Sequence, residues 1–164
     1  MAVTFSAERP EHAPAIEAVL GRAFGPGRFA KTSERVRERV VRHDPALSRV
    51  AFNDADEIIG VCRISWAFAG APVVFLGPLA VDPAARQAGV GLALVREAIA
   101  ACRADGVGVI VLIGAESFFR PAGFTAVPKD RLLLPAPVDP TRLLWLELRP
   151  GETDKVRGAI EAPR

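Results

Sequence analysis

Hydrophobic and polar positions form their clearest pattern between residues 73 and 102. A nearly unbroken apolar run, Val73 to Val81, has the length and the boundaries of a strand that is buried on both faces. A polar corner follows at Asp82-Pro83, and the chain then places two glycines, Gly89 and Gly91, close together. Apolar residues next recur at helical spacing on one side of the chain, at Leu92, Val95, Ile99 and Cys102. The stretch therefore predicts a buried strand, a turn that contains glycine, and an amphipathic helix.

The residues before this stretch predict two helices and three strands. Apolar positions from Ile16 to Phe24 share one face of a helix that Gly25 is well placed to end. A second helix is expected from Thr32 or Ser33 to about Arg42, with alternating charges on its outer side. Several consecutive strands before the glycine turn argue against a regular alternation of parallel strands and helices. These strands are expected at Val3 to Phe5, Ser48 to Phe52 and Glu57 to Ser65.

The residues after the amphipathic helix predict one more buried strand and several short elements. A strand from Val107 to Ile113 should lie parallel to the strand at residues 73–81, because a helix connects the two. The segment from Pro150 is charged and weakly patterned, so we expect it to be loosely held. The short elements are a helix at Ser117 to Ala122 and strand pieces at Phe124 to Val127, Arg131 to Leu134 and Leu143 to Leu148.

Composition restricts the classes of partner. The 164 residues are 50% hydrophobic and 24% charged, which predicts one folded domain at residues 1–150 and a C-terminal tail at residues 151–164. A net charge of +2 is too balanced to favour nucleic acid or a membrane surface. No apolar run is long enough to cross a bilayer, and the amino terminus has no signal-peptide pattern. Cys62 and Cys102 have no metal-binding spacing, so we expect buried free thiols, no metal and a cytoplasmic location.

The glycine turn has the chemistry of an anion site. The first turn of a helix carries N–H groups without a helical partner and a partial positive charge, and glycine lets a bulky phosphate approach them. A nucleoside triphosphate loop would need Gly-Lys-Ser/Thr where this chain has Gly-Leu-Ala, and a dinucleotide fingerprint would need a small residue in place of Leu94. We interpret the turn as a diphosphate cradle that consists of Arg86, Gln87, Ala88, Gly89, Val90, Gly91 and Leu92.

The motif Arg86-x-x-Gly89-x-Gly91 resembles the acyl-CoA diphosphate signature of the GCN5-related N-acetyltransferases, the GNAT family. Two further segments strengthen the resemblance. Leu79 to Pro83, directly before the motif, is similar to the sequence that is common at the end of the fourth strand in this family. Ser117 to Phe124 is similar to the family's short helix that ends in Gly-Phe. The order of elements resembles the family's fold from about Val3 to Arg149.

The resemblance implies an α+β (mixed α/β, three-layer) fold with a central, mostly antiparallel sheet, one parallel strand pair that splays apart, and about four helices. It also implies acetyl-CoA as co-substrate, an amine acceptor that the sequence does not identify, and no metal. The pantetheine arm would lie along Leu79, Ala80 and Val81, whose main chain would also hold the carbonyl oxygen. Gly77-Pro78 would form a bulge that opens the strand pair, or it marks a strand end.

The catalytic groups are less clear than the cofactor site. The chain contains no tyrosine, and Phe119, which is expected to contact the cofactor, stands where the family often has a tyrosine acid. A thiolate can still leave near neutral pH, since a thiol has a pKa of about 8.5. The candidates are Glu116 as base and Ser117 as a hydrogen-bond donor to the sulfur. Their alternatives are a carboxylate that the helix dipole stabilises and a helix-capping serine.

The acceptor site is indicated only in outline. Arg63 and Ser65 share one face of a strand, where they could line an acceptor pocket or face solvent. By analogy with the family, Phe24, Arg28 and Phe29 are suspected to contact the acceptor.

Two other functions stay open at this point. The missing tyrosine, and the absence of a glutamate on the central strand where many relatives carry one, are compatible with a non-catalytic acyl-CoA-binding or sensing domain. The cradle alone is also compatible with another kind of nucleotide-binding module. The sequence does not distinguish a monomer from a homodimer.

Overall fold

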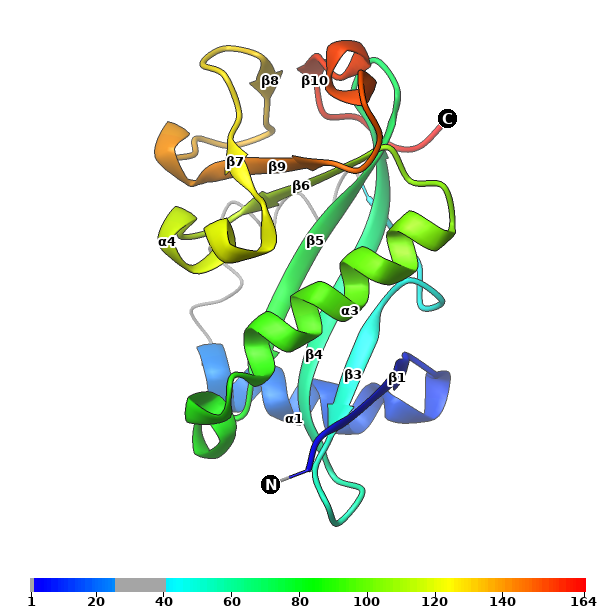
Figure 1. Cartoon of the computed structure of the whole chain (residues 1–164), viewed down its shortest axis with the longest axis vertical. Coiled ribbons are helices and arrows are strands. Elements are labelled where there is room, and N and C mark those ends of the chain that lie inside the picture. The colour runs from blue at the N-terminus through cyan, green and yellow to red at the C-terminus, as the bar shows by residue number, and fades with distance from the viewer. Residues whose placement is uncertain (1, 26–40) are drawn as a thin grey trace.

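The computed structural model describes residues 2–25 and 41–164, and Figure 1 shows the arrangement of its elements. The second helix expected near residue 32 lies outside the described residues, apart from its last two expected residues, Val41, which is in no helix or strand, and Arg42, which lies in a strand. The strands are β1 (Thr4–Ala7), β2 (Arg42–His43), β3 (Arg49–Phe52), β4 (Ile58–Phe68), β5 (Pro72–Val81), β6 (Val109–Ile113), β7 (Thr125–Ala126), β8 (Leu132–Leu133), β9 (Leu143–Glu147) and β10 (Gly158–Ala159). The α-helices are α1 (Ala13–Phe24), α3 (Val90–Ala104) and α4 (Glu116–Phe119). The 3-10 helices are η1 (Pro10–His12), η3 (Pro83–Ala88), η4 (Arg120–Ala122), η5 (Pro140–Arg142) and η6 (Glu152–Lys155).

One mixed sheet forms the centre of the described structure. Its strands follow the order β1-β3-β4-β5-β6-β9-β7, and β2 also pairs with β4. β5 and β6 are parallel, while the other pairs of this sheet are antiparallel. A second, two-stranded sheet joins β8 and β10 in parallel. The expected α+β fold, with a mostly antiparallel sheet and one parallel pair, is confirmed.

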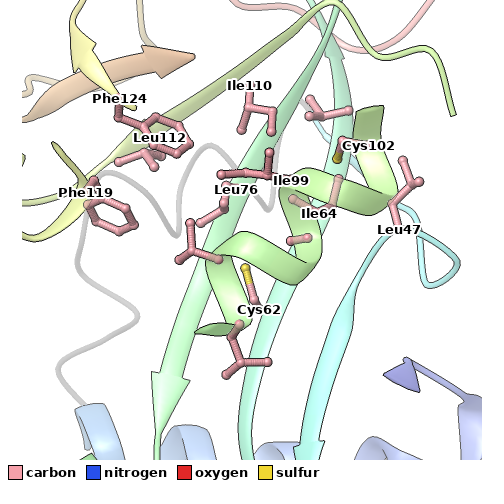
Figure 2. Packing of buried hydrophobic residues seen from close by; sticks show 14 of the residues in the cluster. Leu47, Cys62, Ile64, Leu76, Ile99, Cys102, Ile110, Leu112, Phe119 and Phe124 are labelled. Atoms are coloured by element: carbon pink, nitrogen blue, oxygen red, sulfur yellow. The ribbon is translucent and has the colours of Figure 1, made fainter. Parts of the chain in front are cut away.

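Helices cover both faces of this sheet (Figure 1). On one face, α3 buries its apolar side against β3, β4 and β5, and Figure 2 shows Ile99 and Cys102 of this helix beside Ile64 and Leu76 of the sheet. On the other face, α1 packs its buried residues against Val50, Val61 and Ala80. The three layers follow from the apolar stripe that each helix carries, since burial of one Leu, Ile or Val side chain contributes about 1.5–3 kcal/mol.

The parallel strands β5 and β6 separate partway along their length. They are paired only at Val74↔Ile110 and Phe75↔Val111, and from Leu76 onward β5 keeps its partner β4 alone. The pairing of β4 with β5 shifts at the same level, where Gly77 and Pro78 lie opposite the single residue Arg63. This two-against-one pairing is a β-bulge, which bends and twists a strand. The expected splayed pair is therefore confirmed.

The C-terminal segment is packed against the rest of the chain, so the expectation that it is loosely held is wrong. Residues 152–155 form η6, and β10 pairs with β8. Val156 and Ile160 are 1% and 5% exposed within a buried cluster. Arg131 donates hydrogen bonds to the carbonyls of Val156 and Thr153, both at 2.9 Å. The short strand β8 thus gains its partner from the end of the sequence.

Candidate functional site

A cavity of about 370 Å³ lies beside the splayed end of β5. Five elements enclose it, because the end of β5, the turn after it, the start of α3, the end of α1 and the short helix α4 all contribute lining residues. Its walls are mainly apolar, and an arginine supplies the charge. The lining residues are Ala23, Phe24, Leu79, Ala80, Val81, Arg86, Gly89, Gly91, Leu92 and Phe118.

The amino end of α3 turns unpaired backbone N–H groups toward this cavity. Gly89 is the N-cap residue with φ of 72°, a left-handed conformation that glycine adopts at little cost, and no side chain caps the helix. The N–H groups of Val90, Gly91 and Leu92 therefore lack a helical acceptor. No acidic residue lies in the first turn. The turn combines free donors, the positive end of the helix dipole and open space, which together favour an anion.

The two glycines of the turn serve different purposes. A Cβ atom on Gly89 would meet open space, so this glycine is needed for its backbone conformation and for close approach by a ligand. A Cβ atom on Gly91 would lie 3.2 Å from Cζ of Phe118 and 3.6 Å from Cγ2 of Val81. Any larger side chain at residue 91 would extend into the cavity.

Hydrogen bonds and an ion pair from two arginines connect α1 to the cradle. Arg86 donates from Nη2 to the carbonyl of Ala23 at 3.2 Å and from Nε to the carbonyl of Val81 at 3.4 Å. Arg22 forms an ion pair with Asp82, with an Nη2–Oδ2 distance of 2.8 Å. A cation beside the last carbonyls of a helix also interacts favourably with the helix dipole. The carboxyl end of α1 is thereby held against the turn that follows β5.

The structure brings most of the predicted cofactor-binding residues together. Seven of them, the three strand residues at 79–81, Arg86, the two glycines and Leu92, line the cavity. Val90 is 1% exposed and packs into the core, and Ala88 lies in the same turn without lining the cavity. Gln87 belongs to η3, and its side chain lies outside the described part of the structure.

The aromatic wall of the cavity is Phe118 rather than Phe119. Phe118 lines the cavity and is 41% exposed, whereas Phe119 is 7% exposed and belongs to the core. The Phe119 ring contacts Phe118 and Phe124 edge to face, at centroid distances of 4.8 and 5.7 Å, and fills the space next to Gly114. Figure 2 shows Phe119 and Phe124 among the buried side chains. Two adjacent phenylalanines in a short helix cannot both face the core, but no sequence rule decides which one does.

Neither predicted catalytic residue lines the cavity. Glu116 is in the first turn of α4 and forms an ion pair with Arg120 at 3.1 Å, with 39% of its side chain exposed. Ser117 is exposed, and it does not cap α4, because the N-cap residue is Ala115. The contacts of Glu116 fit a first-turn helix carboxylate.

A polar cluster surrounds Arg63 at the bulge. The guanidinium binds both oxygens of Glu8, with Nε–Oε1 at 3.1 Å and Nη2–Oε2 at 3.3 Å. His43 lies 3.1 Å from Glu8 through Nε2 and 3.3 Å from the hydroxyl of Ser48. Burial raises the pKa of Glu8, but the hydrogen bonds from His43 and Arg63 outweigh this effect, and its pKa is lowered. Glu8 directly follows β1, His43 lies in β2, Ser48 directly precedes β3 and Arg63 lies in β4. Sequence reasoning missed the cluster because its members lie far apart in the chain.

Ser65, which was predicted on the same face as Arg63, is 3% exposed, so the solvent-facing alternative is wrong for it. Of the residues suspected to contact an acceptor, Phe24 lines the cavity, while Arg28 and Phe29 lie outside the described residues.

Within residues 2–25 and 41–164 no group of three His, Cys, Asp or Glu side chains could hold a metal ion. No helix in this part of the chain is long and apolar enough to cross a membrane.

Comparison with known proteins decides the family. The model of the acetyltransferase (GNAT) family matches residues 13–124. This chain belongs to the GNAT family. It is an N-acetyltransferase domain by family, and its splayed strands and glycine turn lie inside the matched region. No curated protein matches the chain.

Solved structures agree with the family assignment. A GNAT family N-acetyltransferase from Escherichia coli, solved in complex with CoA, is 26% identical with a TM-score of 0.80, over 98% of this chain and 89% of that one. A GNAT family acetyltransferase from Brucella melitensis, in complex with acetyl-CoA, is 26% identical with a TM-score of 0.67, over 91% and 90% of the two chains. The ribosomal-protein-S18-alanine N-acetyltransferase from Escherichia coli shares the fold, with 17% identity and a TM-score of 0.63 over 90% of this chain and 94% of that one.

Proposed function

We propose that this GNAT domain transfers an acetyl group from acetyl-CoA to the amine of an acceptor. The observation that carries the proposal is the cavity that runs from the splayed edge of β5 to the free N–H groups at the start of α3. CoA has a diphosphate at one end of its pantetheine arm and a thiol at the other. The cradle would bind the diphosphate, and β5 would guide the arm toward the bulge at Gly77-Pro78.

The edge of β5 provides the remaining polar contacts. Because β6 does not pair with β5 beyond Phe75, β5 has no strand partner on that side at Leu79, Ala80 and Val81 in the described structure. The carbonyl of Val81 accepts a hydrogen bond from Nε of Arg86. Backbone amides left unpaired in a cavity are costly, and the amide groups of a pantetheine arm would satisfy them. An N–H group of the same edge would stabilise the carbonyl oxygen as it gains negative charge.

The reaction places few demands on side chains. The neutral amine attacks the thioester carbonyl, a C–N bond forms, the C–S bond breaks, and the sulfur leaves as a thiolate that can take up the proton released by the amine. A thiolate with a conjugate-acid pKa of about 8.5 leaves near neutral pH without a dedicated acid. The chain therefore does not need the tyrosine that it lacks. Glu116 as base and Ser117 as a donor to the sulfur stay proposals, to be tested by substitution.

We further propose that the protein acts in the cytoplasm on an acceptor that is neither nucleic acid nor membrane lipid, as a monomer or a homodimer. Its two cysteines, Cys62 and Cys102, are buried free thiols, which is typical of proteins in a reducing compartment.

Release of CoA thiol from acetyl-CoA, measured in the presence of a panel of amines, tests the proposed reaction. We expect at least one amine to raise the rate above the slow hydrolysis seen without an amine. Binding of acetyl-CoA without amine-dependent release across primary amines, polyamines, amino acids and peptide amino termini would instead support an acyl-CoA-sensing domain, which the missing tyrosine keeps as the second candidate.

A further inference from the structure

The guanidinium group of Arg86 connects two walls of the cavity. Its Nη2 donates to the carbonyl of Ala23 in α1 at 3.2 Å, and its Nε donates to the carbonyl of Val81 at the end of β5 at 3.4 Å. Ala23 and Val81 both line the cavity. Sequence reasoning placed Arg86 in the diphosphate cradle, but these contacts point to a different role for its side chain.

The ion pair of Arg22 and Asp82 makes a second connection at the same end of α1. Nη2 of Arg22 lies 2.8 Å from Oδ2 of Asp82, and Nε donates to the same oxygen at 2.9 Å. The other carboxylate oxygen of Asp82 accepts from the N–H of Ala84 in η3, the short helix that carries Arg86. Neither partner of this ion pair lines the cavity, so it holds α1 from outside the cavity lining.

The last turn of α1 has no fully buried side chain to anchor it. The fully buried residues of this helix all come before that turn, and its two cavity-lining residues, Ala23 and Phe24, are only partly buried. A helix also leaves its last four carbonyls without helical donors. Arg86 supplies a donor to one of them, the carbonyl of Ala23. The contacts of the two arginines therefore add to a partial apolar contact of the helix end.

We propose that Arg86 and Arg22 are positioning residues, which hold the last turn of α1 in place as one wall of the cavity. This inference rests on the proposed function, but it removes the Arg86 side chain from the diphosphate site. The unpaired N–H groups and the dipole at the start of α3 already favour a diphosphate there. If the guanidinium moved to the diphosphate instead, the Ala23 carbonyl would lose its donor and α1 would lose one of its two connections to the cradle.

Titration with acetyl-CoA tests the two arginines separately. Arg22 lies outside the cavity lining, so a loss of affinity in Arg22→Gln reports the position of α1. We expect Arg22→Gln and Arg86→Gln each to raise the dissociation constant about two- to fivefold, as the loss of an exposed polar contact gives. Arg86→Lys should not restore the affinity, because a lysine keeps the positive charge but loses the planar fork that bridges two carbonyls.

Hydrogen exchange of the amides at residues 21–25 gives a second readout. Acetyl-CoA should slow exchange there in the wild-type protein, because a ligand in the cavity holds its α1 wall in place, and this protection should be smaller in both Gln variants. Arg149→Gln is the matched control. It also removes one positive charge and an exposed ion pair, with Glu152 at 3.5 Å, but Arg149 does not line the cavity. Its affinity and protection should match those of the wild-type protein.

Wild-type affinity in Arg22→Gln would overturn the inference, because it would show that the connection outside the cavity does not affect the ligand. Recovery of affinity in Arg86→Lys would also overturn it, because the charge of residue 86 would then act on the ligand directly. The proposed function would stand in both cases. Failure of the wild-type protein to bind acetyl-CoA would overturn the proposed function and this inference together.

Discussion

At the scale of single residues, two adjacent phenylalanines have different roles, one in lining the cavity and one in packing the core. Phe118 faces the cavity and packs near Gly91, whereas Phe119 fills the core next to Gly114 and Phe124. Phe119 stands where the sequence comparison with the family expects a frequent tyrosine, and the structure gives the Phe119 side chain a buried, apolar environment. The burial of Phe119 and the exposure of Phe118 therefore predict different consequences for the two truncations.

Phe118→Ala should weaken binding of acetyl-CoA and leave the free energy of unfolding nearly unchanged, because 41% of the side chain is already exposed. Phe119→Ala should instead lower the free energy of unfolding by about 3–5 kcal/mol, the usual cost of removing a buried phenylalanine. Denaturant unfolding and ligand titration of the two variants provide the measurement. A large loss of stability in Phe118→Ala, with Phe119→Ala nearly neutral, would reverse the assignment.

At the scale of elements, the C-terminal segment completes the sheet region around β8. A two-residue strand has little stability of its own, and β8 depends on β10, on η6 and on the hydrogen bonds of Arg131. Ile160, which follows β10, donates its N–H to the carbonyl of Leu133 and buries its side chain.

Ile160→Ala should therefore lower the free energy of unfolding by about 2–4 kcal/mol. Leu133→Ala is its control, since Leu133 lies on the partner strand but is 58% exposed, and it should change stability by about 0.5 kcal/mol or less. Chemical denaturation of the two variants measures the difference. Equal, small effects would mean that the end of the chain does not contribute to the folded core.

The same elements explain how far the sequence predicts the structure. The strand at 73–81 and the helix after it were predicted within a few residues, because a long apolar run and a regular helical stripe are local signals. The glycine turn at the start of that helix was predicted for the same reason, since a helix start and its glycines are neighbours in the chain, and its role as a diphosphate cradle stays a prediction. The packing of residues 150–160 and the side chain that lines the cavity depend on contacts between distant segments. The spacing of hydrophobic residues along the sequence does not predict contacts between distant segments.

At the scale of the whole molecule, two buried thiols should make the stability of the folded state fall at alkaline pH. Burial raises the pKa of the Cys102 thiol to about 12, and burial raises the pKa of Cys62 as well. The chain contains no tyrosine that would titrate in the same range. In the unfolded chain a thiol ionises near pH 8.5, so the protonated thiols favour the folded state fully below that pH.

The free energy of unfolding should therefore fall as pH rises from about 8.5 toward 12, by up to about 1.4 kcal/mol per pH unit for each buried thiol. Urea unfolding at a series of pH values measures this slope. The variant Cys62→Ala/Cys102→Ala should have a shallower slope than the wild-type protein, even if its stability at neutral pH is lower. An identical slope in this variant would show that other groups cause the alkaline loss.

The central claim is that the cavity at the start of α3 binds acetyl-CoA, and thermal unfolding with and without the ligand tests it most directly. A ligand that binds only the folded state stabilises it by about 2.7 kcal/mol at a hundredfold excess over its dissociation constant. The account predicts a higher unfolding midpoint with acetyl-CoA, no change with ATP or NAD, and loss of the shift in Gly91→Leu, whose side chain would occupy the cavity. Gly21→Ala, at a helical glycine with no atom near its Cβ position, should keep the shift. No shift with acetyl-CoA, or an equal shift in Gly91→Leu, would contradict the account.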